Sequence, residues 1–137
     1  MATSAPHSSF VRTIAAISGL YDVGVGIFLL AAADRMAATF GVPPPQPAIF
    51  GNLNGLFLVA VGVGYWRPFR EPVHARWYLW LMGVGLKGAG AAAFLTDYFV
   101  RRSPESFLLF AASDGVLALL TLAALAVSRS TPECQRR

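Results

Sequence analysis

The chain has 137 residues, of which 55% are hydrophobic and only 13% are charged, so it is too apolar for an ordinary soluble domain. Its formal net charge is +4, but the arginines stand at the ends of apolar segments and form no basic face, which argues against nucleic acid as a partner. The single cysteine, Cys134, can form neither an internal disulfide nor a metal site, and we expect no metal and no cofactor.

Four apolar segments are long enough to cross a bilayer. They cover residues 10–33, 46–66, 76–99 and 105–128, between polar tails at 1–9 and 129–137. A hydrocarbon core of ~30 Å requires about 20 apolar residues in a helix. The segments lack the alternating pattern of barrel strands, so helices are expected. Because the connections are short, the sequence predicts an all-α membrane protein, a single domain folded as an antiparallel up-down-up-down bundle of four transmembrane helices.

The connections carry interface and turn signals in chain order. The sequence AAADRMAATFG after the first segment is mildly amphipathic and ends at Gly41, a candidate helix C-cap. This piece either lies along the membrane interface or extends the span. Four prolines between residues 43 and 47 then prevent helix formation. The loop before the third segment, RPFREPVHARW, has the arginines and aromatic residues typical of a headgroup boundary.

Small residues predict where the helices pack. The second segment contains Gly51 and Gly55 in a GxxxG pattern, and the third has four glycines between residues 83 and 90. Small side chains let helix backbones approach closely in lipid. We favour contacts within one bundle over a dedicated dimer face, and both alternatives stay open at this point.

Ionisable residues occupy the middle of three apolar segments. Lys87 is the only lysine of the chain, and it lies at a depth similar to that of Asp22 in the first segment and Asp114 in the fourth. The second segment offers Asn52 and Asn54. An unpaired charge at mid-bilayer costs about 2.5–3.5 kcal/mol on insertion scales, so we expect these groups to meet inside the bundle.

Two hypotheses explain this polar centre. It is either a structural staple that holds the helices in register, or a site for a ligand or a proton, and we favour the second. Ser18 lies one helical turn from Asp22 on the same face. Tyr21 and Asp97 are further secondary candidates, the former as a packed aromatic ring and the latter near the far interface.

The pattern of these segments resembles a group of small bacterial membrane proteins. The chain is similar in style to the DoxX-like and related four-helix families. The segments that carry this likeness are LYDVGVGIFLL, an FG followed by a proline-rich turn, NLNGLFLVAVGVGYW, a lysine-bearing third helix and SDGVLALL. The resemblance implies a bacterial inner-membrane location, and some DoxX-type proteins take part in quinone-linked sulfur oxidation. A fainter likeness is to sterol-isomerase-like four-helix membrane proteins, which use acidic residues in an intramembrane cavity.

Three functions are compatible with the sequence. The first is non-enzymatic: binding an apolar, amphipathic or lipid-like small molecule within the bundle, or serving as an accessory subunit of a larger membrane complex. The second is a proton-coupled or cation carrier, which for four helices requires a homo-oligomer. The third is a membrane isomerase or a quinone-linked redox enzyme with Asp22 or Asp114 as acid or base.

The distribution of arginine predicts the orientation of the chain. The two termini and the second loop share one side with seven arginines, whereas the opposite side has three, Arg35, Arg101 and Arg102. The excess predicts that both termini are cytoplasmic.

Cysteine labelling in a Cys134→Ser background tests this orientation. A cysteine introduced at position 101 is expected to react with a membrane-impermeant maleimide added to intact cells. A cysteine at position 70 is expected to react only after the cells are opened, and the reverse pattern would refute the orientation.

Overall fold

The computed structural model describes residues 6–128, and it confirms the all-α fold. Four helical stretches are long and apolar enough to cross a membrane, namely Ser9–Phe40, Ile49–Arg70, Arg76–Arg101 and Glu105–Val127. These four candidate spans of the described residues indicate an integral membrane protein. The first helix runs to Phe40, past the expected end near residue 33.

Each span consists of one or more helical elements. The first is α1 (Pro6–Phe40), and the second joins α2 (Ile49–Gly64) to α3 (Trp66–Arg70). The third is continuous through α4 (Arg76–Tyr78), the π-helix η1 (Leu79–Leu86), α5 (Lys87–Thr96) and the π-turn η2 (Asp97–Arg101). The fourth begins as a 3₁₀ turn, η3 (Glu105–Phe107), and continues as α6 (Leu108–Val127).

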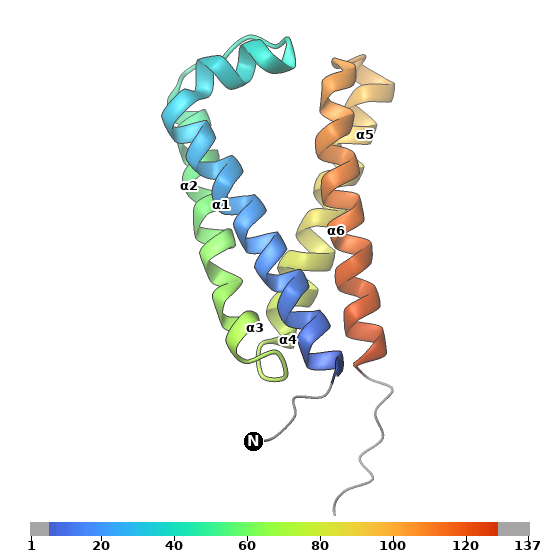
Figure 1. Cartoon of the computed structure of the whole chain (residues 1–137). Helices are drawn as coiled ribbons and strands as arrows, with labels where there is room; N and C mark the ends of the chain where they lie inside the picture. Colours follow the sequence, from blue (N-terminus) through green and yellow to red (C-terminus); the bar gives the residue numbers. More distant parts are fainter. Residues whose placement is uncertain (1–5, 129–137) are drawn as a thin grey trace, which may run out of the picture.

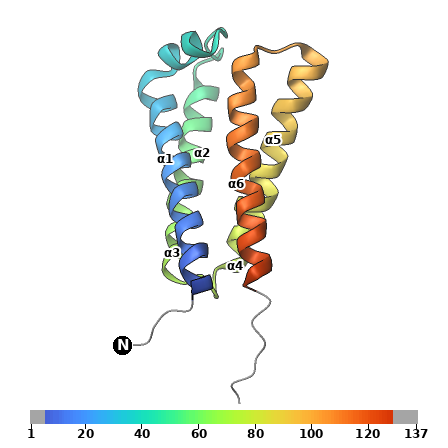
Figure 2. The same ribbon diagram turned by 45° about the vertical axis from the view of Figure 1, so that its right-hand side comes forward.

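The spans form two antiparallel pairs (Figure 1). α1 packs mainly against α2, whereas α5 and η1 pack mainly against α6. The pairs lie close together at the end that holds both described chain ends, and they diverge towards the opposite end (Figures 1 and 2). Consecutive spans run in opposite directions, as the short connections predicted.

The α1–α2 pair is joined by two close backbone contacts. A Cβ atom at Gly62 would lie 2.7 Å from the Gly19 carbonyl oxygen, and one at Gly26 would lie 2.7 Å from the Gly55 carbonyl oxygen. Only glycine permits such an approach, which supplies the van der Waals contact that helices in lipid need. Gly55 of the GxxxG pattern thus serves a contact within the chain.

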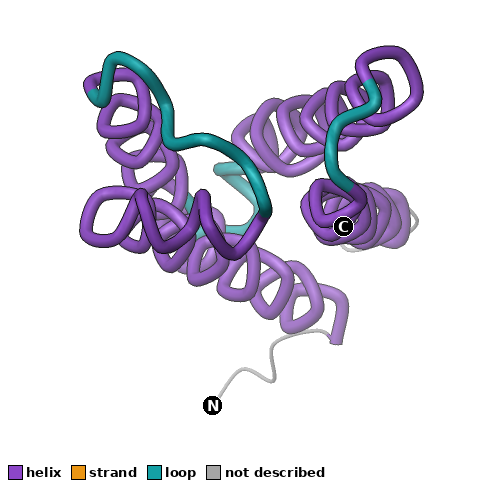
Figure 3. The backbone as a smooth tube through the Cα atoms, turned by 90° about the horizontal axis from the view of Figure 1, so that it is seen from above, coloured by secondary structure: helices purple, strands orange, loops and turns teal. Residues whose placement is uncertain are grey.

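The end of α1 turns across the open end of the bundle. Ala32 has non-helical backbone angles (φ −149°, ψ 42°), and the segment beyond it reaches towards the other helix pair (Figures 1 and 3). Gly41 ends this segment at φ +68°, with Val42 N–H donating to the Ala37 carbonyl at 3.0 Å, which is a Schellman cap. The Ser106 hydroxyl donates to the Phe40 carbonyl at 2.7 Å and ties the segment to the fourth span.

The closely packed core lies in the half of the bundle near the chain ends. It contains residues from all four spans: Val11, Ile14, Ala15, Val61, Tyr65, Leu79, Ala124 and Leu125. Arg76 closes this half, because its guanidinium donates to the Leu125 carbonyl at 2.8 Å and to the Ser128 hydroxyl at 2.7 Å.

The glycine contacts predict which substitutions destabilise the helix pair. In Gly62→Ala, the new methyl group would meet the α1 backbone, and we expect the free energy of unfolding to fall by about 1–3 kcal/mol. Gly24→Ala is the matched control, because its Cβ would meet nothing within 4 Å. Thermal unfolding in mild detergent measures both, and equal effects would contradict the contact.

Candidate functional site

Lys87 lies where the backbone changes from π-helix to α-helix. The π-helix η1 ends at Leu86, and Lys87 is the first residue of α5. A π segment widens the turn and rotates the side chains that follow it, and such segments are frequent at functional sites. The side chain of Lys87 is 5% exposed despite its charge.

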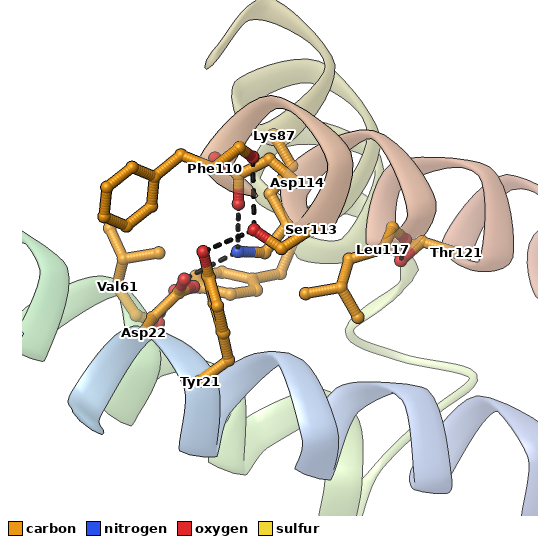
Figure 4. Close-up of polar contacts among 10 residues, drawn as sticks. Tyr21, Asp22, Val61, Lys87, Phe110, Ser113, Asp114, Leu117 and Thr121 are labelled. Atoms are coloured by element: carbon orange, nitrogen blue, oxygen red, sulfur yellow. Dashed lines mark hydrogen bonds and ion pairs between the residues drawn. The ribbon is translucent and has the colours of Figure 1, made fainter. Parts of the chain in front are cut away.

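The ammonium group of Lys87 bridges two acids from different helices (Figure 4). Its Nζ atom lies 2.6 Å from Oδ1 of Asp22 on α1 and 3.4 Å from Oδ1 of Asp114 on α6. These three residues, the polar cluster, therefore connect the α1–α2 pair to the α5–α6 pair. The structure brings them together as their matched depth predicted.

The two acids have unequal surroundings. The Asp22 side chain is 3% exposed and forms the short contact with Lys87, whereas the Asp114 side chain is 18% exposed and forms the long one. A short buried contact of this kind is a strong, charge-assisted hydrogen bond. Asp22 and Lys87 thus behave as a pair, and Asp114 keeps capacity for another partner.

Tyr21 is a further neighbour of Lys87 in the polar cluster. The Lys87 Nζ atom lies 4.8 Å from the centre of the Tyr21 ring, a cation–π distance. The Tyr21 hydroxyl is 2.7 Å from the Ser113 hydroxyl, which itself donates to the Phe110 carbonyl at 3.1 Å (Figure 4). Tyr21 on α1 is thereby connected through Ser113 to α6.

A cavity of about 360 Å³ adjoins the polar cluster on the side where the helix pairs diverge. Asp22, Lys87, Asp114 and Tyr21 line one end of it. The end segment of α1 and the proline-rich loop contribute Met36, Phe40 and Pro45 at the other. The cavity is thus charged at one end and mostly apolar over the rest of its surface, to which Asn54 adds one polar side chain.

Four phenylalanines form an aromatic wall in this cavity. Phe94 stacks on Phe110 with ring centres 5.4 Å apart, and Phe40 lies 4.7 Å from Phe110. Phe107 joins them at 5.7 Å from Phe94. The wall draws on α1, α5, η3 and α6, so it holds both helix pairs together at the open end of the bundle.

The remaining predicted site residues lie apart from the polar cluster. Both asparagines are exposed, and Asn54 lines the cavity whereas Asn52 does not. Residues two apart on a helix point to nearly opposite sides, so only one of the two can face the cavity. Ser18 is fully buried on the side of the packed core. Asp97 accepts hydrogen bonds from Arg101, at 3.0 Å, and from Ser103, away from the cavity.

Ser113 and the aromatic wall were not predicted from the sequence. The spacing of Phe107, Phe110, Asp114, Leu117 and Thr121 places them along one face of the fourth helix. This periodicity was available in the sequence and would have placed two of the four phenylalanines beside Asp114. Ser113 gave no such signal, because its value depends on the position of Tyr21 across the bundle.

Across residues 6–128, no three side chains of the His, Cys, Asp and Glu types gather into a metal-binding group. Comparison of the chain with models of protein families, with curated proteins and with solved structures finds no match.

The cluster geometry predicts a charge-dependent loss of stability. Lys87→Met leaves two acids without their counter-charge, and we expect a loss of about 3–5 kcal/mol in the free energy of unfolding. Combining it with Asp22→Asn removes the buried charge that Lys87 compensates, so much of the loss should be recovered. A double-mutant cycle on unfolding in detergent measures the coupling, and strictly additive effects would contradict the pair.

Proposed function

We propose that this integral membrane protein binds an amphipathic small molecule in the cavity between its two helix pairs. The polar end of the molecule would meet the polar cluster, and its apolar body would lie against the aromatic wall. The observation that carries the proposal is the cavity itself, which has its charged side chains at one end and the phenylalanines of the aromatic wall away from that end.

The size and lining of the cavity support this function. Small-molecule sites are concave, mostly apolar and about 300–1,000 Å³ in volume, with a few polar groups that orient the ligand. A volume of about 360 Å³ lies at the lower end of that range. A small amphipathic molecule matches this volume better than a complete phospholipid does.

The packing around the polar cluster gives access to it from one side, which is sufficient for binding. A carrier would also need a second state in which the cluster is open to the other side of the membrane. On the side of the chain ends, several residues are at most 1% exposed, among them Ser18, Tyr65, Leu79, Thr121 and Leu125. The cavity thus leads to the cluster from the diverging end, and the opposite half is closely packed.

The resemblance to DoxX-like proteins stays a prediction, as do a role in a larger complex and the cytoplasmic position of the termini. The binding proposal depends on none of them. It depends on the contents of the cavity, which can be measured directly.

Native mass spectrometry after mild extraction from membranes tests the binding function. The wild-type protein is expected to carry a small-molecule adduct. Ala33→Trp introduces a large side chain at a residue that lines the cavity, and we expect it to lose most of the adduct.

Ala38→Trp is the matched control, because Ala38 is exposed on the same segment and does not line the cavity. It should retain the adduct. An adduct that persists in Ala33→Trp, or that is absent from the wild-type protein, would count against the proposed function.

A further inference from the structure

The formal charges that line the cavity do not balance. Asp22, Lys87 and Asp114 are the charged members of the lining, so two carboxylates face one ammonium group. Asp22 and Lys87 satisfy each other at 2.6 Å. The surplus negative charge is therefore that of Asp114, the more exposed of the two acids.

The second oxygen of the Asp114 carboxylate packs closely against a glycine of α5. A Cβ atom at Gly90 would lie 3.2 Å from Oδ2 of Asp114, and both residues line the cavity. Oδ1 of the same carboxylate is the atom that contacts Lys87. Among the residues that the structure describes, Oδ2 has no hydrogen-bond partner, and the Asp114 side chain is partly exposed, so Oδ2 can contact a ligand in the cavity.

Aromatic rings lie next to this carboxylate. Phe110 is one helical turn before Asp114 on α6, and Phe94 is one turn after Gly90 on α5, with the two rings stacked 5.4 Å apart. The faces of aromatic rings attract cations, most strongly where water is excluded. The Tyr21 ring already receives the Lys87 ammonium in this way, at 4.8 Å.

We propose that the ligand of this cavity is a lipophilic amine, bound in its protonated form through an ion pair with Asp114 and contacts with the aromatic wall. The inference rests on the proposed binding function and specifies the ligand class. A cationic ligand removes the charge imbalance, and it places its apolar substituents against the phenylalanines. An anionic ligand would add a second surplus negative charge beside Asp114.

The competing account is that a proton neutralises Asp114 and the ligand is uncharged. A protonated carboxyl would donate a hydrogen bond, so a neutral ether would bind as well as an amine. Matched probes separate the two accounts: N-benzyl-N-methylhexylamine as the cation, benzyl hexyl ether as the neutral probe and 7-phenylheptanoate as the anion.

Isothermal titration calorimetry on the protein in phosphatidylcholine nanodiscs, with empty nanodiscs as the blank, measures binding of each probe. We expect the amine to bind the wild-type protein at least about tenfold more tightly than the ether. In Asp114→Asn the two affinities should become equal, and the retained binding of the ether shows that the variant is folded. Asp34→Asn, the same change at an exposed residue outside the cavity, should keep the full preference.

A second pair of variants tests the surroundings of Oδ2 while the Asp114 carboxylate is kept. Gly90→Ala crowds Oδ2 of Asp114 and should reduce the preference for the amine, whereas Gly88→Ala meets nothing within 4 Å and should not. Equal binding of amine and ether by the wild-type protein, or tightest binding of the carboxylate, overturns the inference but leaves the cavity as a binding site. If no probe binds, the inference is also overturned, and the adduct experiment decides the binding function separately.

Discussion

The ion pair between Lys87 and Asp22 connects the two helix pairs inside the bundle, between the packed core at one end and the aromatic wall at the other. Glycine contacts join α1 to α2, and a second set of contacts joins α5 to α6. Lys87 reaches from one pair to the other. Because a misplaced charge in lipid is costly, the pair restricts the relative position of the two halves more than it adds to stability. The floor of the cavity, the position of Asp114 and the Tyr21–Ser113 contact all depend on that restriction.

The polar cluster separates a packed half from an open half. Towards the chain ends, buried side chains from all four spans fill the space between the helices. Towards the opposite end, the helix pairs enclose a cavity. This arrangement lets the two hypotheses for the buried charges hold together. The contact between Asp22 and Lys87 is short and both side chains are buried, which is the geometry of a staple. Asp114 has a longer contact with Lys87 and a partly accessible side chain, which is the geometry of a ligand contact.

Two irregularities of the backbone shape the cavity. The break in α1 at Ala32 directs Met36 and Phe40 across the open end, where Ser106 holds the Phe40 carbonyl. The π-helix before Lys87 sets the direction in which the lysine side chain leaves the third span. A regular helix in either place would rotate or move the residues that follow it, and the charged floor and the aromatic wall would no longer face one space.

The sequence by itself determined the four spans, their antiparallel order and the depth of Asp22, Lys87 and Asp114, because hydropathy, segment length and helical rise are local properties. The cost of charge in lipid then required those three side chains to meet, and this could be inferred without knowing which helix neighbours which. Only the tertiary structure decided that Asn54 and not Asn52 lines the cavity, that the Tyr21 and Ser113 hydroxyls meet, and that Phe40 joins three phenylalanines of the other helix pair. These facts depend on the rotation of each helix and on the divergence of the two pairs. Both are set by contacts between residues far apart in the chain, and no local pattern encodes them.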